Sequence, residues 1–384
     1  MRYTIGQLAE IIDGDRGKNY PKQDEFYPQG YCLFLNTGNV TKEGLIFEEN
    51  QFITKEKDEA LRKGKLKRGD IVYTTRGTVG NAGYYNSNVP YENVRINSGM
   101  VILRANGEIV DARFLYQILK SEYYRPYFKQ YCTGSAQPQL PIKNFSQIYL
   151  NVPDIKTQHR IADILSVYDD LIENNQKQIK LLEEAAQRLY KEWFVDLRFP
   201  GHENSKIVDG VPEGWSRGLL KELISVNYGK DHKKAPDDGN IPVYGSGGLM
   251  RKCNKSLFSG EAVLIPRKGS LNNIMYVDET FWTVDTMFYA TMKQPHTAVF
   301  VYFFVKAFDM YSMNIGAAVP SMTTKILDAM DVVIPDKETL EKFDKREKVY
   351  FNKIKTLQGQ NERLMTARDL LLPKLMYETQ KGDF

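Results

Sequence analysis

One stretch of the sequence comes close to a motif that acts on nucleic acid. Asn88-Val89-Pro90-Tyr91 approaches the Asn/Asp-Pro-Pro-aromatic motif of adenine methyltransferases, but a valine replaces the first proline. No Phe-x-Gly-x-Gly cofactor loop accompanies it, and no Gly-x-x-x-x-Gly-Lys-Ser/Thr loop is present for an ATP-driven motor. We therefore interpret residues 88–91 as a turn.

Other reactive residue types are scattered. A metal-dependent nuclease needs converging carboxylates, and a hydrolase can use a Ser/His/Asp set. Pro236-Asp237-Asp238 and Pro335-Asp336 place carboxylates beside prolines, which is typical of turns. The four histidines, at positions 159, 202, 232 and 296, lack metal-ligand spacing. The sequence thus predicts a chain that is not itself an enzyme and holds neither metal nor cofactor.

The cysteines and the N-terminus indicate a compartment. Cys32, Cys132 and Cys253 are odd in number and far apart, which favours reduced, buried thiols over a disulfide framework or a zinc site. The N-terminus shows no apolar run behind a basic cluster, and no stretch of about 18 apolar residues occurs. We expect a cytoplasmic protein without a membrane span.

The composition is that of a folded protein with a weak basic bias. Hydrophobic residues make up 42% and aromatic residues 12% of the 384, which argues against disorder and allows two domains. The net charge is +4, and no segment forms a polybasic arm. Because a protein that grips DNA unaided usually neutralises many phosphates, charge alone leaves open either weak DNA binding or binding shared with a partner.

The sequence contains an internal repeat. The matched segments are residues 6–11 with 218–223, 69–77 with 260–269, 134–140 with 316–322, and 152–154 with 334–336. The offset falls from 212 to 191 to 182, so the halves share a scaffold and differ in loop length. Divergent loops on one scaffold are expected if the loops carry different specificities. A duplication without separate roles is the alternative.

Each half ends in a stretch that is typical of a long helix. No Pro or Gly occurs from Thr157 to about Phe194, and apolar residues recur at alternating spacings of four and three. The same seam of apolar residues recurs 182 positions later, in the second half, where Glu347 and Arg368 interrupt it. Pro373 is expected to mark the fraying end of the second helix. A helix of about 35 residues spans about 50 Å.

Such long helices have no core of their own, so we expect the two to pack on each other. Asn175 and Asn361 would then be buried polar residues that fix the register. The predicted contact residues are Ile161, Leu165, Tyr168, Ile172, Asn175, Ile179, Leu182, Leu189 and Trp193 in the first helix, and Phe343, Tyr350, Ile354, Leu357, Asn361, Leu364 and Leu371 in the second.

The sequence before each long helix predicts an α+β globule. Strands are expected within residues 69–85, 96–103, 262–265, 274–277 and 281–291, and short helices at 112–123 and 298–307. The predicted fold is therefore two similar α/β domains, each followed by a long helix.

Several motifs resemble one known family. The central region contains QHRIADIL at 158–165, DDLIENN at 169–175 and LYKEWF at 189–194, and it is followed by VPEGW at 211–215 and closed by LLLPKL at 370–375. These stretches resemble the specificity subunits of type I restriction–modification enzymes. The resemblance covers the whole chain, including its length and duplicated layout.

The resemblance implies an architecture. Residues 1–153 and 200–335 would be two target-recognition domains, and residues 154–199 and 336–384 two spacer helices. In this family the helices form an antiparallel coiled coil that relates the domains by an approximate two-fold axis. Each domain reads one half of a split DNA site.

The resemblance also implies partners. The helices would dock two methyltransferase subunits, through which endonuclease/translocase subunits join. S-adenosylmethionine, ATP and Mg²⁺ would be held by those subunits.

Candidate DNA contacts follow from residue type, because Arg and Lys suit guanine and Asn and Gln suit adenine. Arg76 and Arg267 are favoured because they occupy matching places in the repeat, and threonines beside Arg76 could hold phosphates. The full set is Thr74, Thr75, Arg76, Arg95, Asn97, Gln137 and Lys143 in the first domain, and Lys230, His232, Lys233, Lys234, Arg267, Lys268 and Asn273 in the second.

Two other classes of function remain open from the residues. One is a self-contained nuclease or methyltransferase, which detectable cleavage or methyl transfer by the pure chain would reveal. The other is a coiled-coil scaffold without a DNA role, which protection of a defined DNA sequence would exclude.

Overall fold

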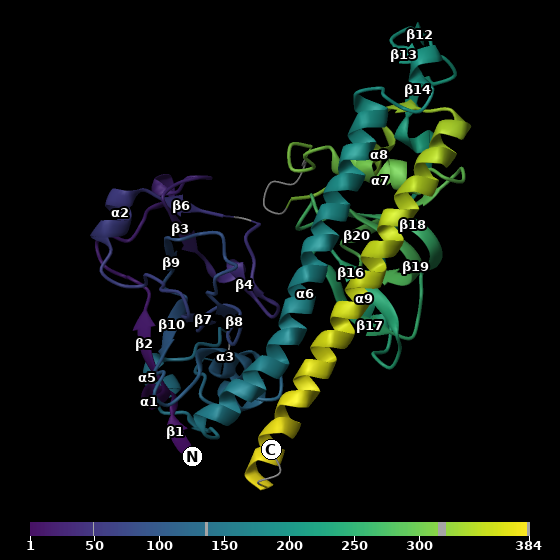
Figure 1. The fold of residues 1–384 in the computed structure, drawn as a ribbon. Helices are drawn as coiled ribbons and strands as arrows, with labels where there is room; N and C mark the ends of the chain where they lie inside the picture. The colour runs from purple at the N-terminus through teal and green to yellow at the C-terminus, as the bar shows by residue number, and fades with distance from the viewer. Residues whose placement is uncertain (49, 135–136, 314–319, 382–384) are drawn as a thin grey trace. The chain divides into compact units, whose positions relative to one another are not determined.

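A computed structural model describes residues 1–384 apart from 49, 135–136, 314–319 and 382–384 (Figure 1). The chain divides into two compact units. The first comprises Met1–Asn175 and Gly359–Phe384, and the second comprises Gln176–Gln358. Each long helix therefore contributes one segment to each unit.

The first unit is built on a four-stranded antiparallel sheet in the order β2-β10-β7-β8. Its strands are β2 (Ala9–Asp13), β10 (Met100–Ala105), β7 (Ile71–Thr74) and β8 (Ala82–Tyr84). All of β7 is buried, and alternate residues enter different cores, Ile71 and Tyr73 on one face and Val72 on the other. A sheet covered on both faces explains why its central strands are apolar without alternation.

Short elements cover the two faces of this sheet. A second sheet has the order β6-β3-β9, and β4 pairs with β5. These strands are β3 (Cys32–Leu35), β4 (Val40–Thr41), β5 (Gly44–Leu45), β6 (Phe52–Ile53) and β9 (Val94–Ile96). The helices are α1 (Ile5–Leu8), α2 (Lys55–Ala60), α3 (Ala112–Lys120), α4 (Arg125–Lys129) and α5 (Ile142–Ser146). Strand β1 (Arg2–Thr4) pairs with β11 (Tyr149–Asn151), which brings the start of the domain to its end.

The second unit is built on a six-stranded sheet in the order β15-β20-β18-β19-β16-β17. Its strands are β15 (Ile224–Tyr228), β16 (Ile241–Gly245), β17 (Gly248–Cys253), β18 (Phe258–Pro266), β19 (Met275–Thr283) and β20 (Met287–Met292). Only the β16–β19 contact of this sheet is parallel. Alternate residues of β18 again enter two cores, Val263 one and Leu264 the other.

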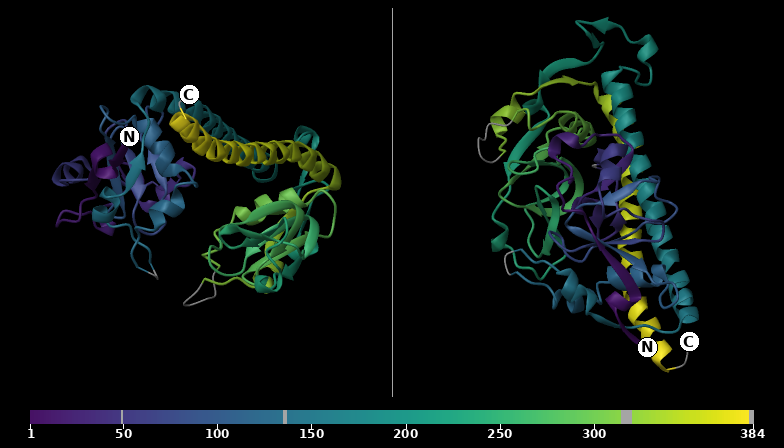
Figure 2. Two further views of the ribbon diagram at one scale, coloured as in Figure 1. Left: turned by 90° about the horizontal axis from the view of Figure 1, so that it is seen from below. Right: turned by 90° about the vertical axis from the view of Figure 1, so that its left-hand side faces the viewer.

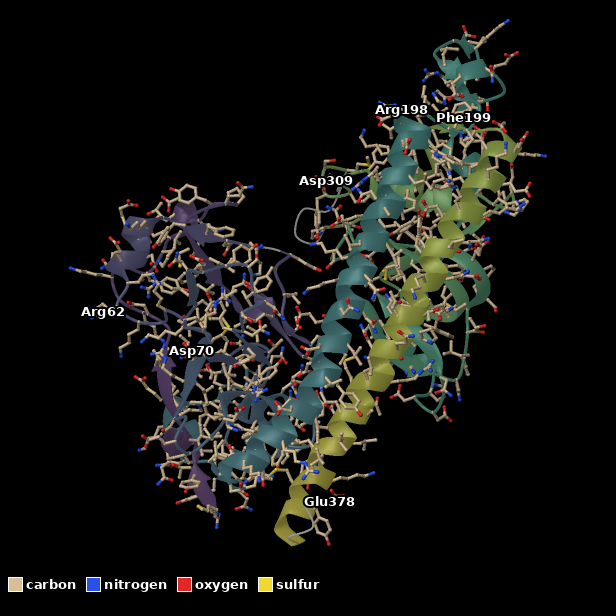
Figure 3. All side chains as sticks on the ribbon, viewed as in Figure 1. Arg62, Asp70, Arg198, Phe199, Asp309 and Glu378 are labelled. Carbon is tan, nitrogen blue, oxygen red and sulfur yellow. The ribbon has the colours of Figure 1, made fainter. Side chains whose placement is uncertain are left out.

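Smaller elements complete the second unit. Helices α7 (Ala298–Lys306) and α8 (Thr324–Asp328) follow the sheet. Strand β14 (Ser216–Leu219) pairs with β21 (Asp331–Ile334), and β12 (Ile207–Val208) pairs with β13 (Val211–Pro212). Phe199, labelled in Figure 3, packs on Trp215 with ring centroids 4.9 Å apart, where the chain leaves the first long helix.

The two units repeat one connectivity. The strand order β2-β10-β7-β8 corresponds to β15-β20-β18-β19, and the pair β1–β11 corresponds to β14–β21. The short helices predicted near residues 112 and 298 are present as α3 and α7. Of the matched segments, residues 135–136 and 316–319 lie outside the described part of the chain. The strands β16 and β17 extend the sheet of the second unit, in the region where the sequence offset changes.

The long helices are α6 (Ile155–Tyr190) and α9 (Lys337–Lys381). Both begin in the same way: Asp154 accepts hydrogen bonds from the backbone nitrogen and hydroxyl of Thr157, and Asp336 accepts the same pair from Thr339. These N-caps satisfy backbone donors that a helix start leaves free. Helix α6 continues into a π-helical turn at Lys191–Val195.

The expectation that Pro373 ends the second helix is wrong, because α9 continues past it to Lys381. Leu372, Leu375 and Met376 around the proline are buried in the core of the first unit. Packing of these side chains compensates for the backbone hydrogen bond that proline removes.

Within each unit the α6 segment lies beside the α9 segment (Figures 1 and 2). Every residue predicted for this seam is buried or half-buried. Arg368 is also buried, and it pairs with Asp169 and Asp369. Glu347 is fully buried, and neither of its carboxylate oxygens has a hydrogen-bond partner.

The cysteines are free thiols, Cys32 and Cys253 buried and Cys132 half-buried. Burial raises the pKa of Cys32 to about 12, so this thiol is an inert apolar side chain at neutral pH. Within the described residues, no helix combines the length and apolar character needed to cross a membrane.

Glu347 makes stability depend on pH. Burial raises its pKa from about 4.5 to about 8, so the folded chain keeps the proton that the unfolded chain loses. Its contribution to stability is complete below about pH 4.5 and is lost as the pH rises toward 8. We predict that Glu347→Leu, which installs the residue found at the equivalent position of α6, Leu165, raises the melting temperature at pH 8 more than at pH 5.

The measurement is thermal unfolding of both proteins across this pH range. Glu362→Leu, at an exposed position of the same helix, is the matched control and should show no such trend. If Glu347→Leu changed the melting temperature equally at pH 5 and pH 8, the raised pKa of Glu347 would be contradicted.

Candidate nucleic-acid interface

The end of β7 forms an exposed turn in the first unit. The backbone nitrogens of Thr75 and Arg76 both donate to the carbonyl of Gly99, at 2.9 and 3.1 Å, and Leu140 donates to the carbonyl of Thr75 at 2.9 Å. Three segments distant in sequence are thereby joined. Arg76 is exposed, and Gly77 has a φ of +70°, a conformation that favours glycine.

The second unit contains the same turn. The backbone nitrogens of Arg267 and Lys268 donate to the carbonyl of Thr286, at 2.8 and 3.2 Å, and Met322 donates to the carbonyl of Arg267 at 2.9 Å. Gly269 follows with a φ of +86°. We name residues 75–77 and 267–269 the strand-end turns.

The hydrogen bonds correct the alignment of the repeat. Arg76 and Arg267 were expected to be equivalent, but the shared backbone pattern matches Thr75 with Arg267 and Arg76 with Lys268. The pairing of β7 and β18 with the following strands agrees, since Thr74 pairs with Met100 and Pro266 with Met287. The offset is 192 along these strands, one more than the 191 that matches Gly69 with Gly260. Each strand-end turn therefore presents one exposed basic residue before its glycine.

Six of the predicted DNA contacts are exposed: Arg76, Gln137, Lys143, Lys230, Lys233 and Lys268. Four more are half-buried: Asn97, His232, Arg267 and Asn273. The side chain of Lys234 lies outside the described part of the structure.

The half-buried residues already have partners. Asn97 accepts a hydrogen bond from the backbone of Gly99 at 2.9 Å, and Asn273 donates to the carbonyl of Ser246 at 2.8 Å. Arg267 lies over the ring of Tyr228, 5.5 Å from its centroid, and donates to the carbonyl of Asp285. These side chains shape the turns that carry them.

Three of the predicted contacts are corrected by the structure. Thr74 and Thr75 are buried, and their hydroxyls donate to the carbonyls of Thr78 and Gly99, at 2.5 and 3.1 Å. Neither hydroxyl faces outward to a phosphate. They hold the strand-end turn in shape instead.

Arg95 is the third correction. It is only 5% exposed, and its Nε donates to Asp58 at 2.5 Å. Its terminal nitrogens donate to the carbonyls of Asp58, Leu61 and Lys63. The residue braces the turn after α2 and does not reach solvent.

Two further arginines, Arg251 and Arg125, carried no signal in the sequence. In the second unit Arg251 donates to Asp237 and to the carbonyls of His232 and Ala235, and so fixes the turn that exposes Lys233. In the first unit Arg125 lines a hollow of about 590 Å³ together with Thr37, Lys42 and Thr78. Both act through loops that only the fold brings together.

Residues considered for catalysis do not converge. Of the described residues, no three among His, Cys, Asp and Glu are grouped so that they could hold a metal ion. The histidines lie against different partners. These are Asp111 for His159, Phe199 for His202, Arg251 for His232 and Asp344 for His296.

Comparison with known proteins decides the family. The family model described as the type I restriction modification DNA specificity domain matches residues 1–184 and again residues 212–365. The chain belongs to this family. It is a type I restriction–modification specificity subunit with DNA recognition domains.

Individual relatives agree with this assignment. The HindI specificity subunit of Haemophilus influenzae is 25% identical, with 97% of this chain and 99% of the relative covered. The MjaIX specificity subunit of Methanocaldococcus jannaschii is 24% identical, with 83% and 80% covered. The crystal structure of the S subunit from M. genitalium has the same fold, with a TM-score of 0.55 at 18% identity over 98% of this chain and 95% of that one.

The position of Arg95 leads to a prediction on stability. Arg95→Met removes one of the two cations that pair with buried Asp58, leaving Lys65, also at 2.5 Å, and it frees the carbonyls that Arg95 holds, so we expect the free energy of unfolding to fall by about 1–3 kcal/mol. Arg76→Ala, at an exposed position, should change it by less than about 0.5 kcal/mol. Urea unfolding of the two variants checks this, and an Arg95→Met protein as stable as the wild type would show that Arg95 is not structural.

Proposed function

We propose that this subunit reads a bipartite DNA site, one half with each recognition domain, and has no catalytic activity of its own. The observation that carries the proposal is the pair of strand-end turns. Equivalent backbone hydrogen bonds place one exposed basic residue, Arg76 or Lys268, on each domain. A duplicated scaffold with two exposed turns suits two similar half-sites read by different side chains.

Arg76 and Lys268 are the proposed base readers. Arginine and lysine side chains pair with the O6 and N7 atoms of guanine in the major groove. Gln137 and Lys143 in the first domain, and Lys230 and Lys233 in the second, are proposed to contact bases or phosphates from neighbouring exposed segments. His232, Lys234 and the half-buried Asn97, Arg267 and Asn273 are proposed only as secondary contacts.

The long helices are proposed to set the distance between half-sites. Residues 1–153 and 200–335 would be the recognition domains, and residues 154–199 and 336–384 an antiparallel coiled coil that relates them by an approximate two-fold axis. The matching caps at Asp154 and Asp336 support equivalent roles for the two helices. Two readers on a rigid spacer can reach major-groove segments about one turn, 34–36 Å, apart.

The helices are also proposed to dock two methyltransferase subunits, through which endonuclease/translocase subunits join. Val167 on α6 and Val349 on α9 occupy equivalent places in the repeat and are 55% and 65% exposed. Exposed valines at equivalent places suit two copies of one partner. S-adenosylmethionine, ATP and Mg²⁺ would be bound by the partner subunits.

Substitution of Arg76 and Lys268 tests whether each domain recognises one half-site. With the methyltransferase present, Arg76→Ala should weaken recognition of one half-site only and lower the discrimination at one of its base pairs by about 1–3 kcal/mol. Lys268→Ala should have the same effect on the other half-site. Mapping of N6-methyladenine with each variant gives the result.

Arg62→Ala is the matched control for Arg76→Ala. Arg62, labelled in Figure 3, is an arginine of the same domain that is not part of the strand-end turn, and its side chain is 78% exposed. It should leave the motif unchanged. Altered recognition of both half-sites by Arg76→Ala would contradict the assignment of one half-site to each domain.

The docking proposal is tested by co-purification. Val167→Glu or Val349→Glu should each prevent the binding of one methyltransferase copy, because a charge would be buried at the contact. The double variant should bind neither copy. Since both positions are exposed, the thermal stability of the subunit should not change. Native mass spectrometry counts the bound copies, and full occupancy of the double variant would place the docking surface elsewhere.

A further inference from the structure

Two polar layers lie between α6 and α9 inside the first unit. In one, the side-chain amide of Asn175 donates to the oxygen of Asn361 at 2.9 Å, and both residues are 7% exposed. In the other, Arg368 donates to Asp169 at 2.7 Å. Residue numbers rise along one helix as they fall along the other, so these segments run antiparallel.

The second layer reaches beyond the helix pair. Asp169 also accepts hydrogen bonds from Gln117 at 2.5 Å and Lys120 at 3.0 Å, both on α3 of the same unit. Arg368 makes a further ion pair with Asp369. Burial alone would raise the pKa of Asp169, but the charges of Lys120 and Arg368 hold it below its ordinary value, so this carboxylate stays ionised.

The repeat shows what each polar residue would meet in another pairing. Because both helices begin at equivalent caps, Asp154 and Asp336, the position equivalent to Asn361 in α6 is Ile179 and the position equivalent to Arg368 is Ala186. In α9 the positions equivalent to Asn175 and Asp169 are Leu357 and Phe351. Neither polar layer recurs at the equivalent positions.

Pairing of like helices would therefore leave polar groups without partners. If α6 of one copy met α6 of a second copy in the same antiparallel register, Asn175 would face Ile179 and Asp169 would face Ala186. If α9 met α9, Asn361 would face Leu357 and Arg368 would face Phe351. An unsatisfied buried amide or charge is costly, and a symmetric dimer would contain each mismatch twice.

We propose that these two layers form a pairing code that admits only the unlike combination, α6 with α9, and rejects pairing between like helices of two copies of this chain. The apolar seam alone lacks this selectivity, since its residues are similar in both helices. The code thus ensures that each helix pair carries one domain of each kind. A single buried asparagine is known to specify the register and oligomeric state of a coiled coil at some cost in stability.

The test uses the full chain and the double variant Asn175→Leu/Asn361→Ile, in which each asparagine becomes the residue at its equivalent position. Copies labelled with ¹⁴N and ¹⁵N are unfolded, mixed, refolded and cross-linked through lysines. Mass spectrometry then identifies cross-links between copies by their mixed isotopes. Lys177 and Lys180 on α6 report α6–α6 contacts, and their cross-links to Lys355 report α6–α9 contacts.

For the wild type we expect α6–α9 cross-links and no mixed-isotope α6–α6 cross-links. For the double variant we expect mixed-isotope α6–α6 cross-links to become readily detectable, at least tenfold above the wild-type level. Ile172→Leu/Leu364→Ile, which alters apolar seam positions in the same unit and keeps both layers, is the matched control and should behave as the wild type.

Thermal unfolding accompanies the cross-linking, so that a misfolded variant is recognised. Asn175→Leu alone should lower the melting temperature because it leaves the buried Asn361 without its hydrogen-bond partner. The double variant should restore the melting temperature. In the wild type, mixed-isotope α6–α6 cross-links as abundant as α6–α9 cross-links would overturn the proposal. A stably folded variant that also carries Asp169→Phe/Arg368→Ala, and so lacks both layers, would overturn it as well if it showed no mixed-isotope α6–α6 cross-links.

Discussion

The apolar stripes of α6 and α9 have to be buried, and this constraint organises each unit. A helix as long as either of these has no core of its own, so its stripe is stable only against another apolar surface. In the first unit Ile161 and Leu165 of α6 share one core with Leu372 and Leu375 of α9 and with the sheet. In the second unit Trp193 and Phe343 do the same. The recognition domains are thus built onto the helices.

Duplication supplies the second constraint. The same strand order and the same strand-end turn occur in both units, although their loops differ in length and the sheet of the second unit is longer by two strands. Backbone hydrogen bonds, which do not depend on side-chain identity, hold the turn in both. The side chains at the turn are therefore free to differ, as Arg76 and Lys268 do. A scaffold fixed by its backbone is well suited to carrying variable specificity.

The spacing of apolar residues made the helices predictable. The burial and partners of single residues depend on contacts between segments distant in sequence, which the sequence does not reveal. The seam follows from spacings of three and four along each helix. The burial of Arg95 depends on Asp58 and on carbonyls of another segment, which residue type cannot reveal. Pro373 was misjudged because leucines beside it pack into a core formed by the other end of the chain. The one-residue shift that matches Arg76 with Lys268, in place of Arg267, became visible only from the backbone hydrogen bonds and the strand register.

The proposed function requires that the chain direct modification to a two-part DNA sequence. The most direct measurement is a genome-wide map of N6-methyladenine in cells that contain the partner methyltransferase, with and without this chain. We predict a bipartite motif, two short specific segments around an unspecified spacer, that is methylated only when the chain is present. If the complex forms and no chain-dependent motif appears, the chain does not confer DNA specificity and the account is wrong.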